Sequence, residues 1–147
     1  MRRILFVCTG NICRSASAEL LLRHWAAQRG LSVEVRSAGI AAEGWYEMPE
    51  HAKRLLAVEG VPSFVHKPQL LTREQLRWAD AVFAMAGNHY DYISELYPEF
   101  IAKTRMLRDK DVADPMGKSY EVFAESLATI KDALEKLIRA ELSAPRT

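Results

Sequence analysis

The chain contains little cysteine and carries almost no net charge. Its 147 residues include 2 cysteines, too few for a disulfide framework or a four-cysteine zinc site. Its 20 lysines and arginines nearly balance 19 aspartates and glutamates, which leaves a formal net charge of +1. A balance this even points to neither a nucleic acid nor an anionic membrane as partner. We therefore expect a small globular protein with no metal site and no cofactor.

Long apolar segments are also missing. No apolar run approaches the ~20 residues that a membrane helix needs. The apolar stretch that follows the N-terminal Met-Arg-Arg is too short for a signal peptide. No repeat, low-complexity segment or linker divides the chain, so we expect a single domain over residues 1–147, located in the cytoplasm.

Short apolar runs alternate with helical patterns along the sequence. The expected strands are residues 3–7, 32–37, 81–85 and 104–107, and the expected helices are 16–29, 49–59 and 88–96. Thr72 and Gln75 form a capping box for a further short helix. A final amphipathic helix of about six turns begins at Tyr120. This alternation predicts an α/β fold with a parallel sheet and helices on both of its faces.

Residues 8–15 read Cys-Thr-Gly-Asn-Ile-Cys-Arg-Ser and lie between an apolar run and a helical pattern. Gly10 and Asn11 tolerate positive φ, so consecutive backbone N–H groups can curl inward into a nest that binds an anion. The following helix points its positive end at the same place. Five residues separate Cys8 from Arg14, which lets the loop circle one tetrahedral oxyanion between sulfur and guanidinium.

Cys8 is the candidate nucleophile of this loop. Only the thiolate form of cysteine attacks well, and the nest, the helix N-terminus and Arg14 all favour the anion. Ser15 can donate a hydrogen bond to the same sulfur. The alternative is a small buried apolar side chain at a strand end. The glycine, asparagine, arginine and serine at these spacings favour the catalytic interpretation.

A thiolate that removes phosphate from an ester also needs an acid to protonate the leaving oxygen. Asp114, in the sequence Asp-Pro-Met-Gly before the last helix, is the best candidate. A turn aspartate that bonds local backbone is an equally good interpretation of that motif taken alone. Asp109 and Asp111 are competitors, although they belong to what looks like an exposed polar loop.

Several motifs together carry a resemblance to a known family. They are residues 7–15, 18–19, 37–39, 66, 70–72, 84–85 and 114–115. With these motifs the chain resembles the bacterial low-molecular-weight protein tyrosine phosphatases over essentially its whole length. The resemblance implies a three-layer α/β/α fold. In it, a four-stranded parallel sheet is flanked by helices on both faces, with a phosphate-binding loop after the first strand.

The resemblance also implies roles for individual residues. Cys8 would form a phosphocysteine, Arg14 would clamp the phosphate, Ser15 would assist the sulfur, and Asp114 would act as general acid and then base. Asn11 would be held by Ser15, Ser37 and His66. The implied substrate-binding residues are Thr9, Gly10, Asn11, Ile12, Cys13, Trp45 and Met116. Cys13 would also form a disulfide with Cys8 that protects the nucleophile from irreversible oxidation, or would simply support the loop as a buried thiol.

The sequence departs from the family beside the expected pocket. Met116 replaces the aromatic residue that commonly follows Asp-Pro, which thins one wall; Ile12, Trp45 and Tyr46 could supply others. Ala16 stands where relatives commonly have proline, which should have a mild effect.

Other functions remain open at this point. Related arsenate reductases need further cysteines, and none follows Cys13. Related protein arginine phosphatases have threonine where this chain has Ile12. Because isoleucine suits a flat apolar ring, we favour phosphotyrosine over phosphoarginine. A non-catalytic phosphate-binding module is disfavoured by the joint presence of Cys8, Arg14 and Asp114. The resemblance implies a phosphorylated protein, such as a bacterial tyrosine kinase, as partner and inorganic phosphate as product.

Overall fold

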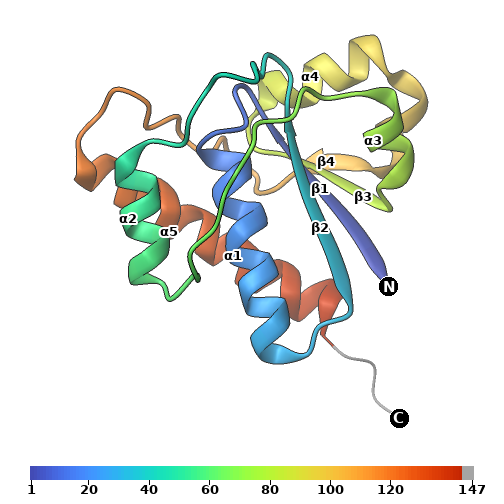
Figure 1. Cartoon of the computed structure of the whole chain (residues 1–147). Coiled ribbons are helices and arrows are strands. Elements are labelled where there is room, and N and C mark those ends of the chain that lie inside the picture. The colour runs from blue at the N-terminus through green and yellow to red at the C-terminus, as the bar shows by residue number, and fades with distance from the viewer. Residues whose placement is uncertain (144–147) are drawn as a thin grey trace.

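The computed structural model describes residues 1–143 and is built around a four-stranded parallel sheet (Figure 1). The strands are β1 (Arg2–Cys8), β2 (Val33–Gly39), β3 (Ala81–Ala84) and β4 (Thr104–Met106). Their order in the sheet is β2-β1-β3-β4, and all three neighbouring pairs run parallel. The predicted parallel sheet is therefore confirmed, with β1 at its centre beside β2 and β3.

Helices cover both faces of the sheet. One group comprises α1 (Arg14–Arg29), α2 (Glu50–Val58) and α5 (Tyr120–Leu137), and the other comprises α3 (Arg73–Trp78) and α4 (Gly87–Leu96). Ile4 and Phe6 of β1 pack into the core under the first group, whereas Leu5 and Val7 pack toward the second. Alternate residues of β1 are thus buried on opposite faces, as its unbroken apolar run requires.

Two details of the helices refine the sequence interpretation. Thr72 Oγ1 accepts from the Gln75 N–H at 3.2 Å and the Thr72 N–H donates to Gln75 Oε1 at 2.8 Å, so the expected capping box is present. The final helix α5 spans 18 residues, which is about five α-helical turns. A wider π-helical turn, Ile138–Leu142, then extends it. A short 3₁₀ helix, Pro98–Lys103, leads into β4.

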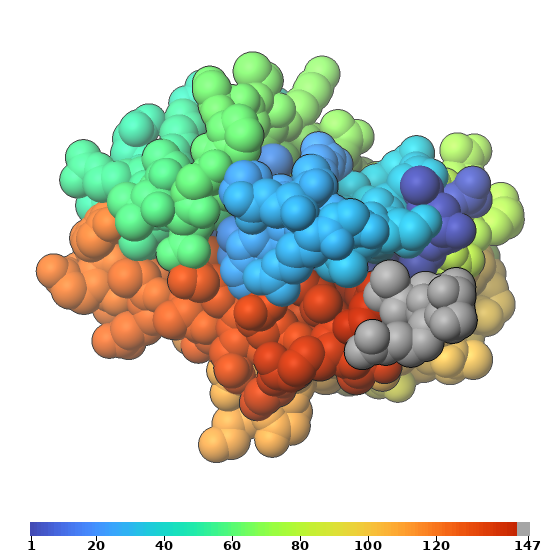
Figure 2. Space-filling model, turned by 90° about the horizontal axis from the view of Figure 1, so that it is seen from below, coloured from blue at the N-terminus to red at the C-terminus, as the bar shows by residue number. Residues whose placement is uncertain are grey.

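The two ends of the sheet differ in what covers them. Seen from below, where the strands begin, α1 and α5 lie side by side across the molecule (Figure 2). At the opposite end, the carboxyl ends of the parallel strands bring together the loops that follow β1, β2 and β4. Within residues 1–143, no helix is long and apolar enough to cross a membrane.

Candidate active site

The loop at residues 8–15 joins β1 to α1, and five of its eight residues are buried, whereas Thr9 is exposed. Asn11 and Ser15 have no exposed surface, and Cys8 and Arg14 are 3% and 7% exposed. Asn11 has φ 58°, and it is the one non-glycine residue with positive φ in residues 1–143. Gly10, which tolerates positive φ, does not adopt it. The left-handed conformation of Asn11 alone turns the chain at this point.

The side-chain amide of Asn11 makes three hydrogen bonds. Its Nδ2 donates to Ser15 Oγ at 2.9 Å and to Ser37 Oγ at 2.8 Å. Its Oδ1 accepts from the backbone N–H of Gln69 at 2.8 Å. The structure thus brings together Asn11, Ser15 and Ser37, which the family resemblance had grouped. These bonds fix the side chain, and with it the strained backbone that makes the turn.

His66, Glu19 and Arg23 support Asn11 directly or through Ser37. His66 Nε2 donates to the main-chain oxygen of Asn11 at 2.6 Å, so it holds the backbone rather than the side-chain amide. Ser37 Oγ donates to the carboxylate of Glu19, and Glu19 pairs with Arg23. The expected network therefore extends to Glu19 and Gln69. The family motif signals Glu19, whereas Gln69 acts through its backbone and leaves no signal in the sequence.

Gly39 lets the loop lie directly on the end of β2. A Cβ atom on Gly39 would lie 2.9 Å from the backbone nitrogen of Asn11 and closer still to the carbonyl oxygen of Thr9. Real Cβ atoms do not approach backbone so closely. The glycine is therefore required for close approach of two main chains, not for a special φ angle.

The hydroxyl of Ser15 lies within hydrogen-bond distance of the Cys8 sulfur. Cys8 Sγ and Ser15 Oγ are 2.8 Å apart, and Ser15 Oγ is 3.4 Å from the carbonyl oxygen of Ala38. Because Asn11 already donates to Ser15 Oγ, the serine hydrogen is available for the sulfur, which is the nearer acceptor. A hydroxyl donor at this place stabilises a thiolate more than a thiol.

Cys13 differs from Cys8 in its surroundings. Both cysteines are free and buried. Burial, helped by the nearby Cys8 and Asp114 and opposed by Arg14, raises the pKa of Cys13 to about 12. Cys13 is therefore a protonated thiol at neutral pH. Its disulfide with Cys8 stays a prediction.

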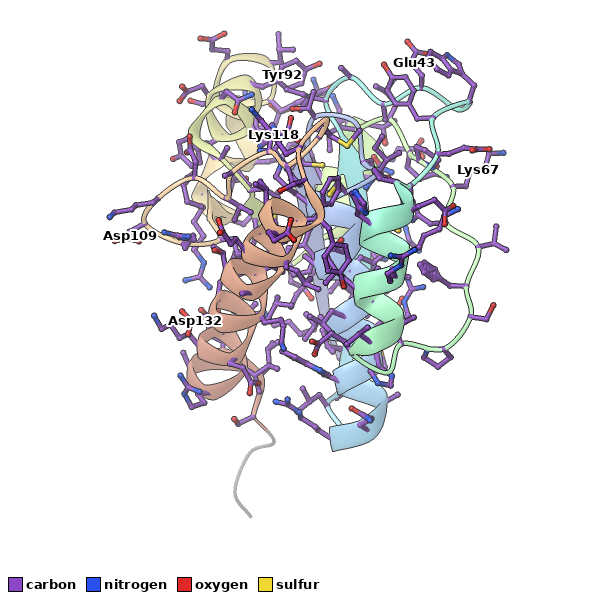
Figure 3. The ribbon with its side chains drawn as sticks, turned by 90° about the vertical axis from the view of Figure 1, so that its left-hand side faces the viewer. Glu43, Lys67, Tyr92, Asp109, Lys118 and Asp132 are labelled. Carbon is purple, nitrogen blue, oxygen red and sulfur yellow. The ribbon has the colours of Figure 1, made fainter. Side chains whose placement is uncertain are left out.

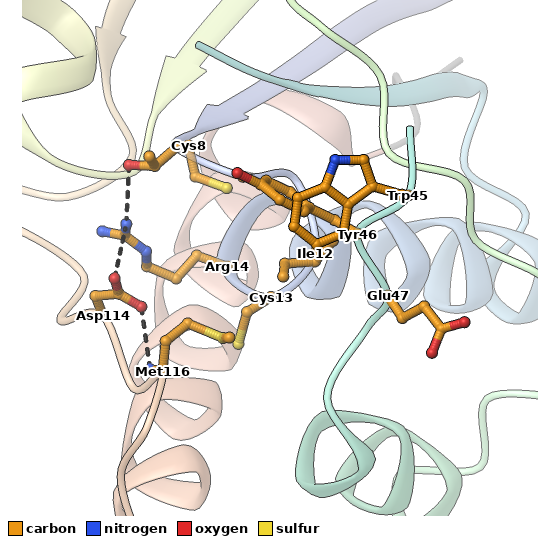
Figure 4. Close-up of a pocket in the computed structure, with 11 residues that line it drawn as sticks. Cys8, Ile12, Cys13, Arg14, Trp45, Tyr46, Glu47, Asp114 and Met116 are labelled. Atoms are coloured by element: carbon orange, nitrogen blue, oxygen red, sulfur yellow. Dashed lines mark hydrogen bonds and ion pairs between the residues drawn. The ribbon is translucent and has the colours of Figure 1, made fainter. Parts of the chain in front are cut away.

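Arg14 lies between the loop and the segment that follows β4. Its Nη1 donates to the carbonyl oxygen of Val112 at 3.1 Å, and its Nη2 lies 3.5 Å from Thr9 Oγ1. The same Nη2 is 3.8 Å from Asp114 Oδ2. Figure 4 draws this ion pair as a dashed line. The guanidinium is thus held by the backbone through Nη1, while Nη2 faces Thr9 and Asp114.

Asp114 combines the two interpretations that its motif left open. Its Oδ1 accepts from the Met116 N–H at 3.1 Å, as a turn aspartate does, while Oδ2 faces Arg14. The side chain is 53% exposed. The segment just before it is fixed, because Val112 N–H donates to Met85 O at 2.8 Å and Ser126 Oγ donates to Ala113 O at 3.1 Å.

The competing aspartates have other positions. Asp111 Oδ1 accepts from the Gly87 N–H at 2.8 Å and so caps the start of α4. Asp109 is exposed and lies on the loop between β4 and α5 (Figure 3). Asp114 is the aspartate that reaches Arg14 and the cavity.

A cavity of about 620 Å³ opens above the loop. Its lining residues are Cys8, Thr9, Gly10, Ile12, Cys13, Arg14, Trp45, Tyr46, Glu47, Asp114 and Met116. The side chain of Asn11, expected among the binding residues, lies beneath this surface instead. Trp45 is 77% exposed and meets Tyr46 edge-to-face, with 4.6 Å between ring centroids. Glu47 was not foreseen, and its carboxylate points away from the cavity floor (Figure 4). Residues 1–143 contain no cluster of three histidine, cysteine or acidic side chains placed to hold a metal ion.

The matched family accounts for this arrangement. The sequence model described as low molecular weight phosphotyrosine protein phosphatase matches residues 3–146. The chain belongs to this family. It is accordingly a cysteine-based phosphatase, and the predicted fold and enzyme class are confirmed.

Relatives of this phosphatase carry two different substrate names. A protein-arginine-phosphatase of Geobacillus stearothermophilus is 39% identical, over 95% of this chain and 97% of its own. The low molecular weight protein-tyrosine-phosphatase Etp of Escherichia coli K12 is 34% identical, over 90% of each chain. A solved YwlE arginine phosphatase mutant with a phosphorylated active-site serine in place of cysteine superposes with a TM-score of 0.87. It is 31% identical, and the match covers 95% of this chain and 97% of that one.

Proposed function

We propose that this phosphatase hydrolyses phosphotyrosine on proteins and that Cys8 carries the phosphoryl group between the two steps. The bond between Ser15 Oγ and Cys8 Sγ supports Cys8 as the nucleophile, because it stabilises the thiolate both as attacker and as leaving group. The phosphorylated serine in the YwlE mutant supports a covalent intermediate at the corresponding place in the family.

In the first step the Cys8 thiolate attacks phosphorus, an S–P bond forms and the P–O ester bond breaks. The transferring group is negatively charged, and the first turn of α1 offers it N–H groups that no side chain caps within residues 1–143. Arg14 adds a fixed guanidinium whose Nη1 is held by Val112 O. Since these donors are in place beforehand, they stabilise the transition state without reorganisation.

Asp114 supplies and then recovers the proton. As a carboxylic acid it protonates the leaving phenolate oxygen as the ester bond breaks. As a carboxylate it then takes a proton from water, whose oxygen attacks phosphorus and releases the Cys8 thiolate and inorganic phosphate. The exposure of Asp114 supports this exchange of protons, while its distance of 3.8 Å from Arg14 keeps it beside the phosphoryl group.

Ile12 is the observation that carries the choice of substrate. It lines the cavity together with Trp45, Tyr46 and Met116, so hydrocarbon, rings and a thioether surround the mouth. A tyrosine ring fits such walls, whereas the Ile12 side chain offers no acceptor to the N–H groups of a guanidinium.

Phosphoarginine is the second candidate, favoured by the 39% identity to a protein-arginine-phosphatase. The two candidates differ in what they need at position 12. A threonine hydroxyl there would accept a hydrogen bond from a guanidinium, and Ile12 offers none.

Three peptides that differ only in phosphotyrosine, phosphoserine or phosphoarginine test the choice. We expect wild-type enzyme to prefer phosphotyrosine, and Ile12→Thr to shift kcat/KM toward phosphoarginine by roughly 10-fold. Ile12→Val is the matched control, because it keeps a branched hydrocarbon and should keep the wild-type preference. A wild-type preference for phosphoarginine would reverse the assignment, and an equal shift in both variants would remove Ile12 as its cause.

We infer a phosphorylated protein in the cytoplasm, such as a bacterial tyrosine kinase, as the physiological partner. The relatives' names, which are those of protein phosphatases, support a protein substrate. Incubation with a phosphorylated tyrosine kinase, with Cys8→Ser as control, tests this. Loss of the kinase's phosphotyrosine signal with wild-type enzyme alone is expected, and an unchanged signal would remove the kinase as a substrate.

A further inference from the structure

One buried polar side chain has no part in the steps above. His89 lies in the first turn of α4 and has no exposed surface. Its Nε2 is 2.8 Å from Thr9 Oγ1, while its Nδ1 has no hydrogen-bond partner, alone among the buried side-chain nitrogens and oxygens of residues 1–143. Burying a histidine with only one of its two ring nitrogens hydrogen-bonded costs folding free energy. A functional role for its bond to the phosphate loop would explain why such a residue is present.

The surroundings of His89 fix its charge. Burial and then the Arg14 cation, opposed by Asp111 and Asp114, lower the pKa of His89 to about 4. The positive end of α4 acts in the same direction as Arg14. The imidazole is therefore neutral at pH 7, with one donor nitrogen and one acceptor nitrogen.

The unpartnered Nδ1 indicates which nitrogen is the donor. A buried N–H without an acceptor is rarer in proteins than a lone pair without a donor. The hydrogen therefore belongs on Nε2, which donates to Thr9 Oγ1. Arg14 Nη2 approaches the same oxygen at 3.5 Å. With both neighbours donating, the hydroxyl hydrogen of Thr9 must point elsewhere, and Thr9 lines the cavity.

We propose that His89 is a positioning residue of the phosphatase: it locks the Thr9 hydroxyl as a hydrogen-bond donor to the phosphoryl group and steadies Arg14 beside it. The proposal rests on the proposed phosphoryl transfer in this cavity. In this proposal, the contact between α4 and the phosphate loop contributes to anion binding through His89 and Thr9. Asp111 caps the same turn of α4, so that turn contacts both the phosphate loop and the segment leading to Asp114.

Four substitutions separate positioning from mere packing. Thr9→Val removes the hydroxyl at constant shape, and His89→Phe removes its partner nitrogen; Thr9→Ser and His89→Gln restore a hydroxyl and a side-chain N–H. Ile93→Val, equally buried in α4, is the control for loss of packing. Each variant is assayed for the inhibition constant of inorganic phosphate, for kcat and KM with p-nitrophenyl phosphate, and for its melting temperature.

We expect Thr9→Val and His89→Phe each to weaken phosphate binding by about 10-fold, and the double variant to weaken it no further. Thr9→Ser and His89→Gln should recover most of the loss. Ile93→Val should lower the melting temperature and leave phosphate binding unchanged.

Two results would overturn the proposal: unchanged phosphate binding in His89→Phe, or a double variant that loses the product of the two single effects. If His89→Phe does not fold, the pair His89→Gln and Thr9→Val decides, because wild-type affinity in Thr9→Val also refutes the role. Phosphate binding measured calorimetrically in the Cys8→Ser background needs no turnover. It therefore separates failure of this proposal from failure of the proposed catalytic function.

Discussion

The phosphate loop at residues 8–15 is held by buried hydrogen bonds, whereas the segment at 111–119 that carries Asp114 is mostly exposed. Asn11 alone has three side-chain bonds to fixed partners. Beyond Pro115, the acid segment reaches solvent, with Met116 42% exposed and Gly117 in open space. The two regions meet at Arg14, which contacts both.

The difference follows from what each region handles. A phosphoryl group is stabilised best by dipoles that are already oriented, and burial with saturated hydrogen bonds keeps the loop in one conformation. A general acid must exchange protons with water in every cycle, which a buried carboxyl would do poorly. The phosphate loop is therefore rigid, and the segment that carries Asp114 is accessible to water.

The largest expected effect belongs to the loop. Cys8→Ser should lower kcat by roughly 10⁴-fold, because a serine hydroxyl is a far weaker nucleophile and leaving group here. Steady-state assays with p-nitrophenyl phosphate measure the loss, and retained phosphate binding shows that the loop is intact. Turnover close to that of wild type would exclude Cys8 as nucleophile.

The acid segment should give a smaller and substrate-dependent loss. Asp114→Asn should slow phosphotyrosine hydrolysis by about 10²-fold, because phenolate is a poor leaving group, and p-nitrophenyl phosphate much less. Asp109→Asn, exposed on the same loop, is the matched control and should keep wild-type rates with both substrates. An equal, slight effect of Asp114→Asn on both substrates would show that another group donates the proton.

One glycine in each region tests rigidity directly. Gly39→Ala places a Cβ against the backbone of Thr9 and Asn11, so we expect about 1–3 kcal/mol of lost stability and weaker phosphate binding. Gly117→Ala meets no neighbouring atom but strains a residue at φ 77°, so about 1 kcal/mol should be lost with little change in phosphate affinity. Urea unfolding and phosphate inhibition measure the two variants. Similar phosphate affinities in both would contradict the contrast between the regions.

The smallest expected effect near neutral pH is a loss of folding stability as the pH falls. It arises from His89, which contacts the phosphate loop. Since the pKa of His89 is about 4 in the folded chain against an ordinary 6.5, only the unfolded chain binds this proton between those values. The contribution of neutral His89 to stability is therefore full above pH 6.5 and falls with pH, by about 1 kcal/mol at pH 5.5 and about 3 kcal/mol near pH 4. Urea unfolding at several pH values measures it. His89→Phe should lack this dependence, and an identical pH profile in that variant would assign the effect to other groups.

Much of the fold could be read from local patterns. Unbroken apolar runs indicated the buried strands β1 and β3, and the spacing in α5 and the capping box at Thr72 indicated helices where they occur. These features depend on neighbours within a few residues, so the sequence displays them. The length of the final helix was less well defined, because its last turn widens into a π helix that the apolar spacing does not reveal.

The sequence by itself determined the chemistry of the loop, since Cys8, Arg14 and Ser15 are close in the chain and one strand–loop–helix unit assembles them. Only the tertiary structure decided what holds and completes that loop. The backbone of Gln69, the close approach at Gly39 and the bond from His89 to Thr9 come from distant segments. Such contacts depend on the order of the strands in the sheet, which brings their carboxyl ends to one edge. No periodic pattern within any one of these segments indicates them.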